Sequence, residues 1–173
     1  MLFRSTNTQT GKVTFGGNVT LDTLTVTADA YDVEFQGSTS TITTDTTFGN
    51  TGAITFAGVN TFTGGLDTTA ASGVSATGTL ATVDTQMDLG DADTGLTLTG
   101  GLTLLSGTGA INTGAVTDGA SSFALTLDDG TNTQTGKVTF GGNVTLDTLT
   151  VTADAYDVEF QGSTSRSEEH TSE

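Results

Sequence analysis

Residues 6–40 read TNTQTGKVTFGGNVTLDTLTVTADAYDVEFQGSTS, and the same segment recurs without a change at residues 131–165, an offset of 125. Internal repeats are established first because they decide the architecture of a chain. Identity this complete indicates either a recent duplication or an artefact of sequence assembly. The duplication by itself therefore does not define the number of copies in the native array.

A shorter period lies beneath this duplication. It is marked by triplets in which a polar residue separates two apolar ones, usually after a glycine or a turn. The triplets are Val13–Phe15, Val33–Phe35, Ile54–Phe56, Val74–Ala76, Leu96–Leu98, Val138–Phe140 and Val158–Phe160. If a degenerate triplet near Val116 fills the one gap, six units of about 21 residues span the offset of 125. We therefore expect the duplication to preserve the phase of the repeat.

Two further apolar series follow the triplets. The second consists of Leu21, Ile42, Phe62, Val83, Leu104, Leu125 and Leu146. The third is weaker and consists of Leu24, Val26, Phe48, Leu66, Met87, Ile111, Leu149 and Val151. Each unit thus offers three short alternating strands separated by Gly, Asn, Asp or Ala-rich corners.

These patterns predict an all-β parallel β-helix, or β-solenoid, with about 21 residues per coil. A unit this short cannot bury a face alone, whereas stacked coils pair each strand with its counterparts above and below. The side-chain period of two directs Val, Leu and Phe inward and Thr outward. We expect Phe15, Phe35 and Phe56 to form an internal column, interrupted at Ala76 and Leu98. It would resume at Phe140 and Phe160.

An antiparallel sandwich also has short strands and frequent turns, but it gives no reason for a constant period. A helical fold is excluded because the apolar spacing is two and because Thr and Gly are poor helix formers. The absence of proline fits interior strands, where a proline would remove a ladder hydrogen bond.

The composition limits the possible partners. The chain of 173 residues has 20 acidic and four basic residues, a net charge of −16, 42 threonines and no cysteine. Nucleic acid and anionic membranes require clustered Lys and Arg, so neither is an expected partner. No apolar run is long enough to enter a bilayer, and disulfides and thiolate metal sites are absent.

Both ends differ from the repeats. Residues 166–173 read RSEEHTSE and residues 1–5 read MLFRS, and both resemble the translation of a sequencing-library adapter. We exclude both ends from the fold, together with the only histidine, His170. The predicted organisation is thus a solenoid fragment over 6–165. If the protein is secreted, we expect this fragment to be an internal piece, because it carries no export signal of its own.

Acidic residues supply the only metal candidates. Asp88, Asp91 and Asp93 could offer carboxylate oxygens to Ca²⁺. Their spacing does not fit an EF-hand, and the glycine-rich calcium-roll motif is missing, so solvated turn acids are the preferred interpretation. Asp128 and Asp129, followed by Gly130, form a second weak candidate corner. We assign no catalytic and no cofactor-binding residue.

Two functions other than a structural one are compatible with a β-solenoid, namely polysaccharide-active catalysis and ice binding. A polysaccharide-active β-helix enzyme needs a base or a pair of carboxylates held across a cleft. The repeats supply only Lys12 and Lys137, which occupy one repeat position, as do Glu34 and Glu159. No long insertion builds walls around a substrate, so we expect no enzyme.

Ice binding requires the same pair of threonines on successive coils. Residues 23–27 read TLTVT, and one period further on the matching residues are Thr44 and Thr46. The next period brings Gly65 and Asp67, so the array breaks. A regular ice-binding face is not predicted.

Segments such as GKVTFGGNVTLDTLTV and GAITFAGVNTFTGGL resemble the passenger repeats of filamentous-haemagglutinin-like and autotransporter adhesins. The resemblance covers nearly all of 6–165 and is one of composition and period. It implies a right-handed β-helical shaft exported to the bacterial cell surface, with adhesion or biofilm roles and host-surface or matrix glycans and proteins as partners. Exposed terminal coils present unpaired strand edges, so we expect the isolated segment to aggregate or to be marginally stable.

Overall fold

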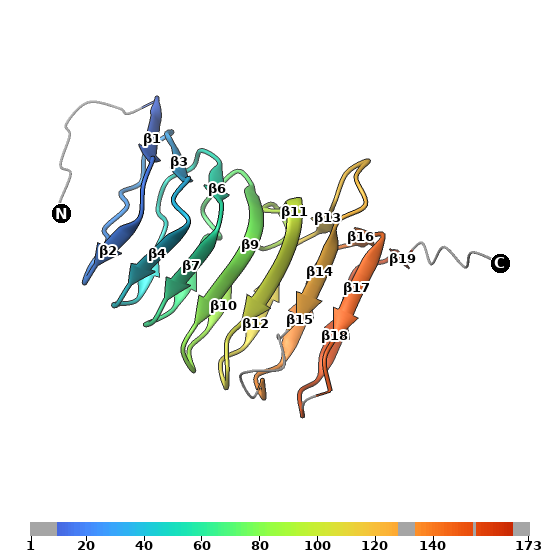
Figure 1. The fold of residues 1–173 in the computed structure, drawn as a ribbon. Coiled ribbons are helices and arrows are strands. Elements are labelled where there is room, and N and C mark those ends of the chain that lie inside the picture. The colour runs from blue at the N-terminus through green and yellow to red at the C-terminus, as the bar shows by residue number, and fades with distance from the viewer. Residues whose placement is uncertain (1–9, 128–133, 154, 168–173) are drawn as a thin grey trace.

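The chain folds as a stack of parallel β-strands, confirming the predicted solenoid. The computed structural model describes residues 10–127, 134–153 and 155–167, and these residues form strands and no helix. Every strand pairing among them is parallel, and the strands follow one another along a single axis (Figure 1). No helix long and apolar enough to span a membrane is present in the described part.

Each coil passes through three faces, which we call the first, second and third face. The first face consists of β1 (Lys12–Phe15), β3 (Asp32–Phe35), β6 (Ile54–Phe56), the start of β9 (Val74–Thr82), the start of β11 (Leu96–Leu105), β13 (Val116–Thr117), β16 (Val144–Leu146) and β19 (Ser165–Ser167). The second face consists of β2 (Val19–Leu21), β4 (Thr39–Ile42), β7 (Val59–Phe62), the ends of β9 and β11, β14 (Ala124–Leu127) and β17 (Thr148–Val151).

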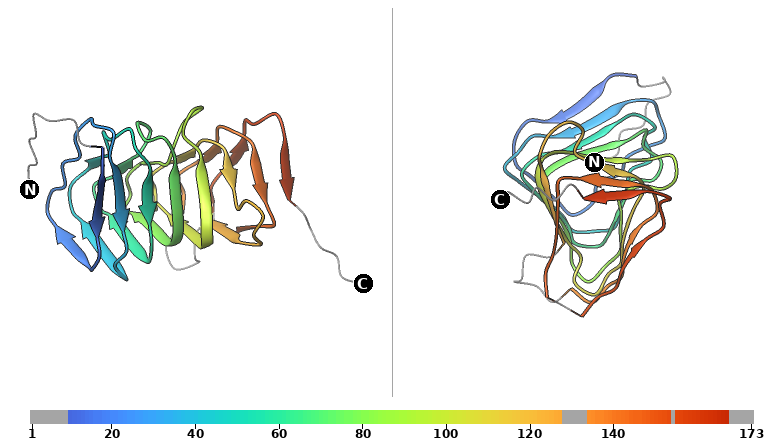
Figure 2. Two further views of the ribbon diagram at one scale, coloured as in Figure 1. Left: turned by 90° about the horizontal axis from the view of Figure 1, so that it is seen from above. Right: turned by 90° about the vertical axis from the view of Figure 1, so that its right-hand side faces the viewer.

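The third face is a separate six-stranded sheet. It consists of β5 (Thr46–Thr47), β8 (Leu66–Asp67), β10 (Met87–Asp88), β12 (Ile111–Thr113), β15 (Val138–Phe140) and β18 (Val158–Phe160). The first two faces form one sheet of 13 strands because β9 and β11 run through the corner between them. Seen along the axis, the coils lie over one another around a common core (Figure 2).

Alternation of side chains builds the core. In β6 the two apolar residues are buried and Thr55 between them is partly exposed, and β15 repeats this pattern. β12 has the same alternation of burial, with Thr113 as its second buried residue. A strand directs successive side chains to opposite sides of the sheet, so each triplet contributes two residues to the lumen. Parallel register then places apolar side chains directly over one another from coil to coil.

The aromatic column begins as predicted. The ring of Phe35 stacks between those of Phe15 and Phe56, with centroid distances of 4.7 and 5.5 Å. Phe48 and Phe62 contact the rings of Phe35 and Phe56 edge-on. Ring edges carry positive and ring faces negative partial charge, so this mixture of stacked and edge-on contacts is favourable. The predicted interruption is also present, since Phe56 pairs with Ala76 and Ala76 with Leu98.

The second apolar series is wrong from Val83 onward. Thr82 pairs with Phe62 and is 4% exposed, whereas Val83 is 51% exposed. The reason is the parity of β9, a continuous nine-residue strand in which Leu80 and Thr82 both point inward. In the third series, the pairing of Met87 with Leu66 and Ile111 is confirmed.

The expectation that the duplication preserves phase is also wrong. Phe140 and Phe160 lie on the third face and stack on each other at 5.0 Å, whereas the equivalent Phe15 and Phe35 lie on the first face. The first-face column continues instead from Val116 to Val144.

The cause is the length of the corners. Successive residues of the first-face column are 20 to 22 positions apart up to Val116, but the step from Val116 to Val144 is 28. On the third face, the steps from Met87 to Ile111 and from Ile111 to Val138 are 24 and 27. The offset of 125 residues between the two copies therefore corresponds to five full turns and two further faces. It is one face short of six turns.

The predicted end of the solenoid at Ser165 falls within a strand. β19 runs to Ser167, and its backbone pairs with β16. Residues 1–5 and 168–173 lie outside the described part of the chain. The proposed origin of both ends in adapter sequence remains a prediction.

The duplication supplies a matched pair of mutations. Phe35 is 0% exposed, whereas Phe160, the same position of the second copy, is 45% exposed. We expect Phe35→Ala to lower the free energy of unfolding by about 3–5 kcal/mol, because it removes buried surface and leaves an enclosed cavity. Phe160→Ala should cost about 1–2 kcal/mol, because its side chain is half exposed and leaves no enclosed cavity. Chemical denaturation followed by circular dichroism measures both, and equal losses would contradict this account of the core.

Candidate functional site

The outer surface of the shaft carries two vertical rows of hydroxyl groups. The first hydroxyl ladder lies on the first face and consists of Thr55, Ser75, Thr97, Thr117 and Thr145, which pair in successive register. The second lies on the second face and consists of Thr79, Thr103, Thr126 and Thr150. All these residues are partly or fully exposed. Adjacent rungs of a sheet lie ~4.8 Å apart, so each ladder is a regular array along the axis.

Sequence reasoning missed these ladders. The threonine pairs evident in the sequence were those of residues 23–27 and, one period later, Thr44 and Thr46. Thr44 donates a hydrogen bond to Thr23 at 3.2 Å, but Thr46 is buried and pairs with Leu66. The usable signal was the polar residue at the centre of each apolar triplet, which the strand period directs outward.

The second face does not extend its ladder into a two-column lattice. The column two residues further along these strands contains Thr41, Thr61, Ala81 and Leu105. Of the second-face strands from β4 to β11, only β4 has threonine in both columns, at Thr39 and Thr41. An ice surface lying against the second face would therefore contact one continuous row of hydroxyls and a second row that is interrupted.

Two of the three metal candidates, Asp88 and Asp91, accept hydrogen bonds from neighbouring protein groups. The carboxylate of Asp88 accepts hydrogen bonds from the side-chain amides of Gln86 and Asn112, both at 2.7 Å. One oxygen of Asp91 accepts the backbone N–H groups of Asp93 and Thr94, at 2.9 and 3.1 Å. Asp88 thus belongs to a rung of the third face, and Asp91 closes a turn.

No metal centre is assembled by these residues. Within the described ranges, no group of three or more His, Asp or Glu side chains is arranged to hold a metal ion. Asp91 and Asp93 are both exposed, as solvated turn acids are. Asp128, Asp129 and Gly130, the second candidate corner, lie outside the described residues.

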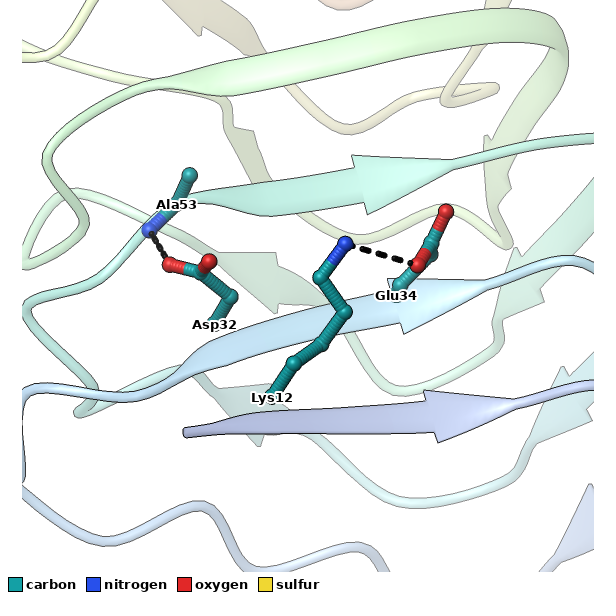
Figure 3. A network of polar contacts seen from close by, with 4 residues as sticks. All are labelled: Lys12, Asp32, Glu34 and Ala53. Carbon is teal, nitrogen blue, oxygen red and sulfur yellow. Dashed lines mark hydrogen bonds and ion pairs between the residues drawn. The ribbon is translucent and has the colours of Figure 1, made fainter. Parts of the chain in front are cut away.

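The two lysines of the repeats each bind the glutamate of the coil above. Lys12 Nζ lies 3.1 Å from Glu34 Oε2, and Figure 3 shows this pair beside Asp32, whose carboxylate accepts the backbone N–H of Ala53 at 2.8 Å. Lys137 and Glu159 form the equivalent ion pair in the second copy. Both lysines are exposed on the shaft, and their ion pairs link neighbouring coils.

The surroundings of both glutamates lower their pKa below the ordinary value of 4.5. At Glu34 the hydrogen bond with Gln36 is the largest cause of the lowered pKa, followed by the hydrogen bond with Lys12. At Glu159 the hydrogen bond with Lys137 is the largest cause, followed by that with Gln161. Each contact favours the ionised carboxylate. The contribution to stability is therefore present above the unfolded-state pKa and is lost as the pH falls through the lower folded-state pKa.

We expect Lys137→Met to raise the pKa of Glu159 more than Lys12→Met raises that of Glu34, because Gln36 remains as the main stabilising partner of Glu34. Side-chain carboxyl chemical shifts measured by NMR between about pH 2 and pH 6 report both values. Thr139→Met, on the strand of Lys137, is a control for loss of a polar side chain. Equal shifts in the two lysine variants would show that the glutamine bonds do not control these carboxylates.

Comparison with protein-family models, with curated proteins and with solved structures finds no match for this chain. The parallel solenoid alone does not identify a family, because one fold can carry unrelated functions. The resemblance to adhesin passenger repeats therefore rests on the residues quoted in its support. Function, partners and location follow as proposals.

Proposed function

We propose that the chain is a shaft segment of a large secreted bacterial surface protein, with a structural or adhesive role and no catalysis. The observation that carries the proposal is the continuous column of paired strands on the first face, which runs from β1 to β19 without a break. Eight strands at ~4.8 Å per step give a rod of about 34 Å. Such a segment supplies length and stiffness.

The outer surface of the shaft is polar, as expected for a segment that is surrounded by water. Hydroxyl ladders cover two faces, and the third carries Asp67, Asp88 and Asn112 in register. The described part of the chain forms only two ion pairs, while the whole chain bears a net charge of −16. Charge of one sign keeps a protein soluble and opposes lateral association between shafts. Neighbouring coils of the same chain are then the main partners of each coil, with surface or matrix glycans and proteins as further proposed partners.

The enzyme alternative has little support in the site geometry. Both repeat lysines are tied to glutamates on exposed strands, and Asp88 and Asp91 accept hydrogen bonds from neighbouring protein groups. General acid–base catalysis needs such groups directed at a bound substrate. An exposed ladder of hydroxyls instead offers a long polar contact surface, which favours adhesion over catalysis.

A stiff shaft should hold two distant points of the first face at one distance. Thr14 and Thr145 belong to one outward column, six steps apart, so spin labels on Thr14→Cys and Thr145→Cys should give one narrow distance near 30 Å. The chain has no cysteine of its own, so labelling is specific. Pulsed electron–electron double resonance measures the distribution of distances between the two spin labels, with the labelled chain diluted in unlabelled chain. Adding Phe35→Ala is a control that should broaden it, and a broad distribution in the parent would contradict a stiff shaft.

The surface location has a separate test. A long uninterrupted read through the parent gene should show an export signal and an anchoring domain flanking these repeats. An adjacent catalytic domain would instead favour the enzyme alternative. The same read counts the copies of the 35-residue segment in the native array.

A further inference from the structure

Within the described part of the chain, the strands of the second face contain no charged residue. These strands lie side by side along the axis of the shaft (Figure 1). Their sequences are VTL, TSTI, VNTF, GTLAT, LTLL, ALTL and TLTV. Charged residues lie instead on strands of the other two faces, among them Lys12, Glu34, Asp67, Asp88 and Glu159. In a chain with a net charge of −16, one long side of the shaft is thus built from neutral strands.

The outward side chains of this face form two rows of methyl groups. The first row pairs in register from coil to coil and consists of Thr39, Val59, Thr79, Thr103, Thr126 and Thr150. Each of these side chains has a methyl group on Cβ, so the hydroxyl that is missing at Val59 leaves the methyl row intact. The second row lies two residues further along the strands and consists of Thr20, Thr41, Thr61 and Ala81. It has a methyl group at every rung and ends at Leu105, which is buried.

The side chains of both rows are accessible, short and stiff. Val59 is 43% exposed, and the other members are partly or fully exposed. Threonine and valine are branched at Cβ, which restricts each of them to few rotamers. Contact with a flat surface therefore costs little side-chain entropy. The two rows are already ordered before any partner arrives.

The spacing of the rows is close to that of water molecules in ice. Rungs of the sheet lie ~4.8 Å apart, and the two rows are separated by two residues along each strand, about 6.7 Å. Tetrahedral water molecules joined by hydrogen bonds of about 2.75 Å have second neighbours about 4.5 Å apart and a hexagonal layer repeat of about 7.3 Å. The mismatch along the axis is about 0.3 Å per rung. Over the steps from Thr79 to Thr150 it accumulates to about 1 Å, so a short row stays in step with the lattice.

We infer that the second face binds ice, a function beyond the proposed structural role of the shaft. Water beside apolar groups loses orientational freedom. Methyl groups at this spacing order the water between them in positions close to those of the crystal. The hydroxyls of Thr79, Thr103 and Thr126 can each donate one hydrogen bond to this water and accept others from it. The ordered layer then joins the ice lattice and attaches the shaft to it.

The other two faces lack this combination of groups. On the first face the outward column contains Glu34, which binds Lys12, and Ser75, which has no methyl group. On the third face it contains Asp67 and Asp88. An ionised group is costly to remove from its own hydration shell, so neither column fits against a crystal of water. Neither methyl row includes the threonines of residues 23–27, from which the sequence predicted no regular ice-binding face.

Inhibition of ice recrystallisation by the full chain tests the inference. We expect ice grains to coarsen more slowly than in an equal concentration of a globular control protein. Thr103→Lys should raise the concentration needed for inhibition at least tenfold, because it places a charge within the first row. Thr97→Lys is the matched control, since Thr97 is a partly exposed outward threonine of the same strand but lies on the first face. This control should keep the activity of the parent chain.

Two milder substitutions separate the methyl groups from the hydroxyls and keep the test valid if Thr103→Lys unfolds the chain. Thr103→Val keeps the methyl group and removes the hydroxyl, so it should retain most of the activity. Thr103→Ser keeps the hydroxyl and removes the methyl group, so it should weaken the inhibition severalfold. Melting followed by circular dichroism verifies that each variant is folded.

Three results would overturn the inference. The first is coarsening of the ice grains at the rate of the control protein, and the second is an equal loss of activity in Thr97→Lys and Thr103→Lys. The third is binding to crystalline cellulose in a sedimentation assay without activity on ice, which would assign the face to a neutral glycan. The distance between Thr14 and Thr145 tests the shaft separately from all three.

Discussion

Register between parallel strands is the constraint on which the structure depends. Backbone hydrogen bonds fix each strand one step above the previous one, so every side chain lies over the residue at the same position of the coil below. Phenylalanine then meets phenylalanine in the lumen, and threonine meets threonine on the surface. The core is thin, but it extends with every coil, and stability is a sum over neighbouring coils.

Register also explains the distribution of polar groups. Asn112 bonds Asp88 and Lys12 bonds Glu34 because strand pairing brings residues some 20 positions apart into contact. Corner groups act similarly, since Asn18 accepts the backbone N–H of Thr39 and Asn143 accepts that of Thr164. These bonds link one coil to the next around the outside of the shaft, where water competes for each of them.

Much of the fold was predictable because its two determinants are local. Alternation within Val33–Phe35 defines which side chains face inward, and the spacing near 21 residues defines stacking. The prediction failed where the chain departs from that spacing. Thr82 points inward in place of Val83 because side chains alternate along the continuous strand β9. Val138 lies on the third face because the corners before it are longer. The first hydroxyl ladder was missed although its signal was present, because Thr97 and Thr117 are the outward residues of triplets that the period stacks on each other. Corner length is set by loops that carry little periodic signal.

The placement of identical segments on different faces has a consequence for how such genes change. Recombination between the two copies would delete or insert 125 residues, which is not a whole number of turns. In most repeat proteins a fractional unit would misalign everything downstream. Here the two copies already occupy different faces, since β15 and β18 pack on the third face whereas their duplicates β1 and β3 pack on the first. A change of length by a third of a turn is therefore compatible with the local sequence of these strands.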